Sequence, residues 1–273
     1  MLLLGCDRAA SPLAGPTREF TDARGKAVRV PFPPKRIVSV VPSATELLFA
    51  AGAGDQVTAV TTYCDWPPEA RAKPKIGDIV VDWEKLASLH PDVILTSWSL
   101  TRKTTEDLEK KGYVVFAVDA NDFDEIARTL RTLGDMTGHP EGAKAADALL
   151  ARARSVADRD GPTFYFEHSP NPLGTTGPES YTGRALRQAG GRNIFDGGWR
   201  TADWESVLAR DPDVILIAHD RREGLERRAG WKDLKAVKSG RVHLVAKEHY
   251  VYPTPRLADG LEEAARLFHA KNP

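Results

Sequence analysis

The feature that most constrains the fold is a fourteen-residue segment that occurs twice. Residues 82–95 read DWEKLASLHPDVIL, and residues 203–216 read DWESVLARDPDVIL. In each copy an acidic start and helical spacing are typical of a short helix, the Pro-Asp pair ends it, and the β-branched run that follows is typical of a buried strand. One such helix and strand in each half predicts two related lobes about an approximate two-fold axis.

Short apolar runs alternate with helical patterns along the rest of the chain. They are rich in β-branched residues, bounded by Gly, Pro or Asp, and occur at 36–41, 57–61, 93–97, 114–118, 164–168, 214–219 and 242–246. Strands that alternate with helices form parallel sheets covered by helices. The sequence therefore predicts an α/β fold with two parallel-sheet lobes.

The middle of the chain has a different pattern. Residues 140–158 are rich in Ala, lack an internal Pro and contain no strand signal, which favours one long helix. We therefore expect an N-terminal lobe at 25–137, a linking helix at 138–159 and a C-terminal lobe at 160–273. A single helix resists wide hinge motion, so a ligand cleft between the lobes is expected to be largely pre-formed.

Residues 1–24 are expected to form a signal or lipoprotein tether. The run Leu3-Leu4-Gly5-Cys6 resembles a bacterial lipobox, and the Ser-, Pro-, Ala- and Gly-rich stretch after it suits a flexible linker. Cys6 is the expected lipidation site, which implies a periplasmic or cell-surface protein anchored by lipid. Only five residues precede Cys6, so either the true signal is longer or the resemblance is accidental.

Composition and motifs argue against several functions. Lys plus Arg and Asp plus Glu both total 38, so no net field attracts nucleic acid or an anionic membrane. No apolar run approaches the ~20 residues of a membrane span. No strand is followed by a dinucleotide fingerprint, a P-loop or a nucleophile elbow. We expect a binding protein without a cofactor, and not an enzyme.

Several segments together resemble a known family. RIVSVVPSATELLFAAGAGDQVTAVTTYCDWPPEA at 36–70, the repeated PDVI element and YPTPRLADGLEEAARLFH at 252–269 are similar to class III periplasmic substrate-binding proteins, the helical-backbone group that serves ABC importers. The resemblance covers about 30–270 and is strongest to the cobalamin-binding branch. It implies a monomer that binds a corrinoid between its lobes and delivers it to a permease dimer with ATPase subunits.

The resemblance gives the repeat a function. In this family a Glu on each lobe docks against Arg pockets of the two-fold-symmetric permease, and the matching residues are Glu84 and Glu205. Two similar charge-assisted contacts would hold both lobes in one orientation. The alternative is local: Asp82 and Asp203 are helix N-caps, and the helix dipole alone favours Glu in the first turn.

Ligand contacts are expected after the carboxyl ends of parallel strands. By resemblance, Tyr63 matches an aromatic residue that contacts cobalamin, and Trp98 lies near another. Three residues of the second lobe, His168, His249 and Tyr250, follow strands there. In the cobalamin branch the two His positions often hold aromatic residues. Imidazole can stack, donate a hydrogen bond or ligate a metal, so a tetrapyrrole fits both lobes.

Two other kinds of cargo stay open. A ferric siderophore or haem would use the same scaffold with different side chains. A bare zinc or manganese ion needs three or four His or carboxylate ligands, and the first lobe offers no His after its strands. Three nearby residues are expected to have other roles: Cys64 is a small buried side chain, Trp66 packs at a turn, and His219 is a loop residue.

Overall fold

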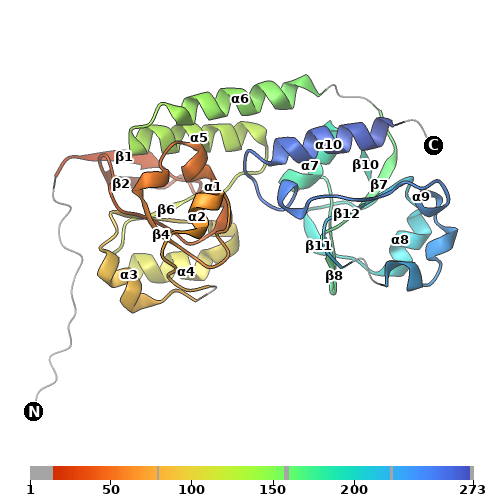
Figure 1. Cartoon of the computed structure of the whole chain (residues 1–273), viewed down its shortest axis with the longest axis horizontal. Coiled ribbons are helices and arrows are strands. Elements are labelled where there is room, and N and C mark those ends of the chain that lie inside the picture. Colours follow the sequence, from red (N-terminus) through yellow and green to blue (C-terminus); the bar gives the residue numbers. More distant parts are fainter. Residues whose placement is uncertain (1–14, 79, 157–159, 222–223, 271–273) are drawn as a thin grey trace, which may run out of the picture. The chain divides into compact units, whose positions relative to one another are not determined.

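The computed structural model describes residues 15–78, 80–156, 160–221 and 224–270, and it contains two compact units (Figure 1). The first unit comprises residues 1–120 and 125–147, and the second comprises 121–124 and 148–273. A four-stranded parallel sheet forms the centre of each unit. The predicted fold class, α/β with two parallel sheets, is confirmed.

The first unit has the strand order β4-β3-β5-β6, together with an antiparallel hairpin of β1 and β2. Its strands are β1 (Thr17–Thr21), β2 (Ala27–Pro31), β3 (Ile37–Ser39), β4 (Val57–Val60), β5 (Val93–Thr96) and β6 (Val115–Ala117). Its helices are α1 (Pro42–Ala50), the 3-10 helix η1 (Gly54–Gln56), α2 (Pro68–Arg71), α3 (Trp83–Leu89), α4 (Trp98–Lys110) and α5 (Phe123–Thr137).

The second unit has the strand order β10-β7-β12-β13 and a small antiparallel sheet, β11-β9-β8. Its strands are β7 (Thr163–Glu167), β8 (Ser169–Pro170), β9 (Leu173–Thr176), β10 (Arg192–Asn193), β11 (Trp199–Thr201), β12 (Val214–Ile217) and β13 (Val242–Leu244). Its helices are α7 (Tyr181–Gln188), α8 (Trp204–Arg210), η2 (Leu225–Arg227), η3 (Trp231–Asp233), α9 (Lys235–Lys238), η4 (Lys247–His249) and α10 (Leu257–His269).

The repeated segment occupies the same topological place in both units. Numbered along the chain within its own unit, each parallel sheet has the order second, first, third, fourth, and the PDVIL strand is the third. The Asp of each Pro-Asp pair reaches across to the first strand's start: Asp92 accepts from the Arg36 amide at 2.9 Å, and Asp213 from the Thr163 amide at 3.0 Å. The predicted helix, break and buried strand are present in both copies.

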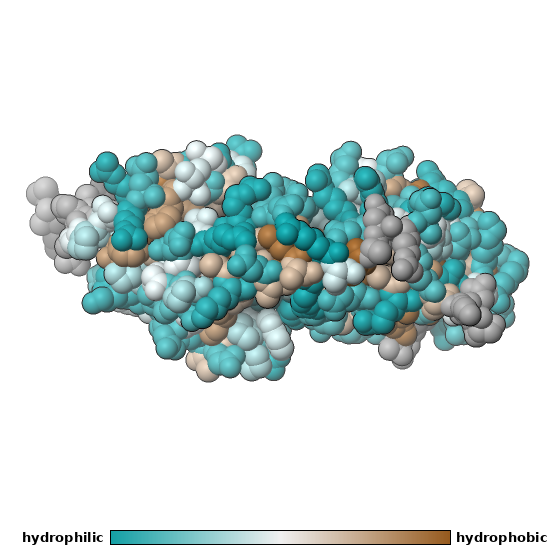
Figure 2. All heavy atoms as spheres, turned by 90° about the horizontal axis from the view of Figure 1, so that it is seen from above, coloured by the Kyte–Doolittle hydropathy of each residue, from teal (hydrophilic) through white to brown (hydrophobic). Residues whose placement is uncertain are grey.

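The Ala-rich middle of the chain forms the helix α6 (Glu141–Ser155), and the division between the two units falls inside it. Ala146, Leu149 and Ala153 are buried at a helical spacing while most other residues of α6 are exposed, so one face of the helix packs inward. Hydrophilic residues accordingly dominate the face of the molecule in Figure 2.

The first unit begins earlier in the chain than predicted. The prediction assigned residues 1–24 to it, but β1 begins at Thr17 and pairs along its length with β2. Asp22, which is buried, accepts hydrogen bonds from the amides of Arg24 and Lys26, and the Ala23 amide donates to the Ala117 carbonyl. The strand reads TREFT and is mostly exposed, so its sequence carries no apolar alternation to reveal it.

Candidate ligand-binding and docking sites

The carboxyl edge of the first sheet carries exposed apolar side chains. Tyr63 and Trp66, which follow β4, are 54% and 41% exposed. Leu100 follows β5, and Val80 lies in the loop whose Gly77 carbonyl accepts from the Thr62 amide. Because ligands of parallel α/β sheets bind beyond the carboxyl ends of the strands, the exposed side chains in these connections are candidate ligand contacts.

Trp98, at the start of α4, is less accessible to a ligand than Tyr63. Its ring is half-buried, and the guanidinium carbons of Arg24 and Arg102 lie 5.3 and 4.8 Å from the ring centroid. Asp119 accepts hydrogen bonds from the Trp98 amide and the Ser97 hydroxyl, both at 2.7 Å, so this carboxylate already occupies the helix start. The ring of Trp98 is therefore less accessible to a ligand than the prediction assumed.

In the second unit, His168 lies in an aromatic group at the carboxyl end of β7. Its ring is 4.9 Å from that of Trp199 in an edge arrangement, and Trp199 also contacts Tyr181 at 5.5 Å. Burial, followed by the charge of Lys247, lowers the pKa of His168 below its usual value. The imidazole is thus neutral at pH 7 and is free to stack or to accept a hydrogen bond.

Trp199 was missed by the sequence-based prediction. It is 39% exposed on β11, a strand too short and too polar to stand out in the sequence. The signal that could have revealed it is the pair Gly197-Gly198 directly before an isolated Trp, because glycines at a turn often present the next side chain. Trp199 belongs beside His168 among the candidate contacts.

The two other predicted residues of the second lobe differ in accessibility. Tyr250 is fully buried, and its hydroxyl shares its one hydrogen between two acceptors at 3.0 Å, the Gly260 carbonyl and the Glu263 carboxylate. Burial, with the charge of Glu263, raises the pKa of Tyr250 above its usual range. The predicted ligand contact through Tyr250 is not supported by this burial. His249 remains partly exposed, with Nδ1 3.9 Å from Glu263.

A buried polar network lies beside these aromatic residues. Glu167, at the end of β7, is fully buried and accepts two hydrogen bonds of 2.7 Å from Arg228. His219 Nε2 lies 2.9 Å from the same carboxylate. A pocket of about 290 Å³ opens here, lined by His219, Asp220, Leu244, Val245 and Ala246. No sequence signal pointed to this network, because Arg228 lies in a polar loop.

Glu84 and Glu205 occupy the same position of the repeated helix. Each is exposed and lies in the first turn of a seven-residue helix, α3 or α8, whose N-cap is Asp82 or Asp203. Each N-cap carboxylate accepts from a backbone amide three residues on, Lys85 or Ser206. Within the described ranges neither Glu makes an ion pair, so both carboxylates are available to a partner.

The remaining candidates do not form a metal site. Cys64 is fully buried beside the Thr61 hydroxyl, at 3.2 Å, as expected for a small packed side chain. Trp66 is exposed, although it was expected to pack at its turn. The described part of the chain contains no group of three or more His, Cys, Asp or Glu side chains placed to hold an ion. Cys6 lies outside the described residues.

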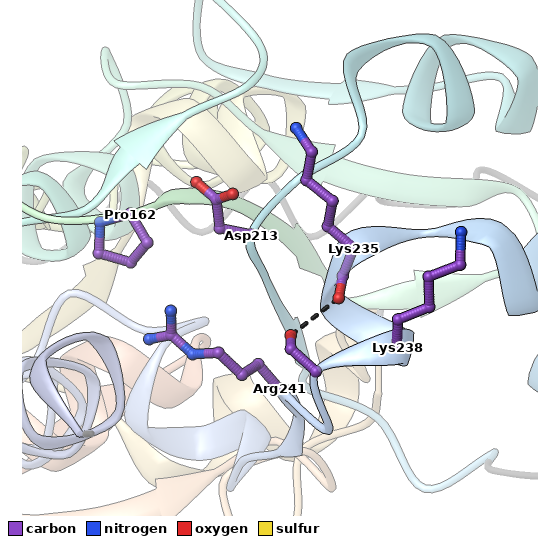
Figure 3. A pocket seen from close by; sticks show the side chains of 6 residues that line it. Pro162, Asp213, Lys235, Lys238 and Arg241 are labelled. Carbon is purple, nitrogen blue, oxygen red and sulfur yellow. Dashed lines mark hydrogen bonds between the residues drawn. The ribbon is translucent and has the colours of Figure 1, made fainter. Parts of the chain in front are cut away.

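A second pocket, of about 470 Å³, lies at the opposite edge of the second sheet (Figure 3). Its lining comes from the amino ends of β7, β12 and β13 and from α9: Pro162, Asp213, Lys235, Lys238, Ser239 and Arg241. The side chains of Lys235 and Lys238 extend in diverging directions, and the Asp213 carboxylate accepts a hydrogen bond from the Thr163 hydroxyl. These groups do not converge on one point, unlike the network at Glu167.

The sequence is similar to that of known transport proteins. The family described as "Periplasmic binding protein" matches residues 37–248. The chain belongs to this family. It is 30% identical to the uncharacterized ABC transporter substrate-binding lipoprotein YvrC of Bacillus subtilis, covering 98% of this chain and 93% of that one. It is also 30% identical to a vitamin B12-binding protein of Vibrio cholerae, covering 85% and 88%.

A solved structure shares the fold. The periplasmic vitamin B12-binding protein BtuF of Vibrio cholerae matches with a TM-score of 0.77 and 26% identity, over 86% of this chain and 97% of that one. The protein is thus the substrate-binding component of an ABC transporter, which binds its substrate without converting it. None of its helices in the described ranges has the length and apolar character of a membrane span.

Proposed function

We propose that this ABC-transporter binding protein binds cobalamin or a related corrinoid. The observation that carries the proposal is a pair of exposed aromatic residues: Tyr63, which follows the carboxyl end of β4, and Trp199, which packs against the neutral His168 just after β7. Aromatic faces with a few polar groups suit a large, flat, partly apolar ring. The vitamin B12-binding relatives support the same cargo.

The test is a titration of the purified protein with cyanocobalamin and aquocobalamin, followed by tryptophan quenching and calorimetry. One-to-one saturable binding supports the proposal, and a preference for aquocobalamin would assign His168 or His249 as a cobalt ligand. Haem and a ferric hydroxamate siderophore are titrated alongside. Binding of either without binding of a corrinoid would move the cargo to iron.

Substitutions locate the corrinoid contacts. Tyr63→Ala and Trp199→Ala should each weaken binding about tenfold, because each removes an exposed aromatic face. Tyr113→Ala is the matched control, since Tyr113 lies before β6 at the opposite edge of the first sheet and should leave affinity unchanged. Equal losses in all three variants would contradict this placement of the ligand.

We also propose that Glu84 and Glu205 dock the protein on its permease dimer. Both carboxylates are exposed, lie in the same position of the repeated helix and have no ion-pair partner in the described structure. Glu84→Ala and Glu205→Ala should leave corrinoid affinity intact and weaken stimulation of the transporter ATPase about tenfold, the effect of losing one charge-assisted bond. Glu19→Ala, at an exposed Glu of β1, serves as the control.

We also propose that the protein is anchored by a lipid on Cys6. Its Bacillus subtilis relative YvrC is a substrate-binding lipoprotein, which supports this proposal. Labelled palmitate should be incorporated into the full chain and lost in Cys6→Ser, which should be released from the membrane fraction. Equal labelling of both proteins would rule out Cys6 as the anchor site.

A further inference from the structure

Trp204, the residue before Glu205, is held by the segment 225–231. Its indole N–H donates to the Ala229 carbonyl at 2.7 Å, and its ring stacks on Trp231 at 5.9 Å with an angle of 24°. The Arg228 guanidinium lies 4.9 Å from the same ring. A hydrogen bond, an aromatic stack and a cation–π contact thus fix one side chain in the first turn of α8.

The segment that holds Trp204 is itself fixed to the sheet. Arg228 forms its two parallel hydrogen bonds with Glu167, and this geometry sets the plane of the guanidinium as well as its position. Burial alone would lower the pKa of Arg228, but the hydrogen bonds and charge of Glu167 outweigh burial and raise it. Since a carboxylate only accepts, His219 Nε2 donates the third bond. The chain of contacts therefore runs from the carboxyl end of β7 to α8.

In the part of the first unit that the structure describes, the tryptophan of the repeat has fewer contacts. Trp83 occupies the position of Trp204 and contacts the Lys111 amine, which is 4.9 Å from its ring. Its indole N–H has no hydrogen-bond partner among the residues that the structure describes. The two copies have identical Asp-Trp-Glu starts but differ in what lies beside the tryptophan.

We propose that Arg228 and Trp204 are positioning residues for transporter docking. They hold the first turn of α8 so that Glu205 is presented in one orientation, whereas Glu84 is presented without this support. A carboxylate whose backbone is already fixed loses less conformational freedom on association, so it forms the stronger of the two contacts. This inference rests on the docking role proposed for Glu205.

The test compares Trp204→Phe with the matched variant Trp83→Phe. Each keeps an aromatic ring and removes the indole N–H, but only at Trp204 does this break a hydrogen bond in the described structure. Docking of the ligand-free full-length protein on the cognate permease–ATPase complex in nanodiscs is measured by surface plasmon resonance. Hydrogen–deuterium exchange of 204–210 and 83–89 reports the order of the two helices.

Trp204→Phe should weaken docking roughly threefold to tenfold, with the contribution of the lost intramolecular hydrogen bond as the upper limit, and should speed exchange in 204–210. Arg228→Lys, which cannot form the bidentate contact with Glu167, should also weaken docking and speed exchange in 204–210. Trp83→Phe should change neither quantity. Corrinoid affinity, measured with cyanocobalamin, and the melting temperature should stay near the wild-type values in Trp204→Phe.

Three results would overturn the proposal. The positioning role is wrong if Trp204→Phe docks as the wild type does while Glu205→Ala docks weakly. It is also wrong if Trp204→Phe lowers docking, cyanocobalamin affinity and melting temperature together, because that pattern reports general destabilisation. If Glu205→Ala itself docks normally, the docking role fails first and the inference fails with it.

Discussion

At the residue scale, side chains at the carboxyl edges differ in what they leave free for a ligand. Tyr63 presents an exposed ring, whereas Trp98 is flanked by two arginines and Tyr250 is fully enclosed. His168 is intermediate: it packs against Trp199, and its surroundings hold it in the neutral form. Availability here depends on neighbours that lie far away in the chain.

The neutral state of His168 predicts a pH dependence. Its pKa is lowered in the folded protein, so the unfolded chain, with a pKa of about 6.5, binds the proton more readily. The contribution of His168 to the free energy of unfolding should be full above about pH 6.5 and be lost as the pH falls through the lower folded pKa.

An NMR titration of the His168 ring gives the direct measurement, with a midpoint expected below the usual value. Lys247→Gln removes the positive charge that contributes to the lowered pKa, so it should raise the midpoint. Burial of the ring should still keep the midpoint below the usual value for histidine. A wild-type midpoint at or above about 6.5 would contradict the neutral imidazole.

At the element scale, α3 and α8 end in the same unusual way. Their C-cap residues, His90 and Asp211, have φ of 45° and 41°, in the left-handed region that favours glycine. The two residues differ in whether a side-chain hydrogen bond offsets the cost of the left-handed backbone. Asp211 accepts a hydrogen bond of 2.8 Å from the Lys235 amide, whereas the exposed His90 imidazole makes no bond in the described residues.

His90→Gly should therefore raise the free energy of unfolding by about 0.5–1 kcal/mol, because it relieves the left-handed backbone at no loss of contacts. Asp211→Gly should give no gain, since the lost hydrogen bond is worth about 1 kcal/mol. Urea unfolding of both variants measures the contrast. Equal stabilisation of the two would show that the bond to Lys235 contributes nothing.

A second element-scale feature is the close approach of α5 and α6. A Cβ at Gly142 would lie 2.4 Å from the Leu130 carbonyl oxygen and 2.7 Å from the Gly134 Cα. Gly142→Ala should lower the free energy of unfolding by about 2 kcal/mol through overpacking, against the usual helical gain of about 1 kcal/mol. Ala143→Gly, at the exposed neighbour, should cost only about 1 kcal/mol. Stabilisation by Gly142→Ala would contradict the close helix contact.

At the scale of the whole molecule, α6 is bound to both units. Its first half packs on α5 and pairs Asp147 with Arg131 at 2.6 Å. Its second half pairs Arg152 with Asp259 and Glu262 of α10, at 2.6 and 2.8 Å. One continuous helix thus makes stabilising contacts in each unit, and we expect it to couple their unfolding.

Ala148→Pro, at the division between the units, should break that coupling. Proline costs about 3 kcal/mol in a helix interior, and calorimetry should resolve two unfolding transitions in place of one. Ala148→Gly keeps the helix hydrogen bond at a cost of about 1 kcal/mol and should retain the single transition. One transition in both variants would mean that α6 does not carry the coupling.

Local patterns allowed a good part of the fold to be predicted. The β-branched runs, the capping residues and the repeated Pro-Asp break depend on neighbours within a few residues, so their strands and helices were predicted. The hairpin strand β1 was missed. It is held by its pairing with β2, and its exposed polar residues show no apolar alternation from which a strand could be predicted. Trp199 was missed for the same reason.

The sequence by itself determined the alternation of strands and helices, the repeat in two units and the family, because each follows from short-range spacing or from similarity along the chain. Only the tertiary structure decided which side chains are accessible. Tyr250 is enclosed by α10, Glu167 is joined to Arg228 across 61 positions, and the two repeated tryptophans have different partners. Burial and hydrogen bonding between distant segments form only when the chain has packed, so identical local sequences acquired different surroundings.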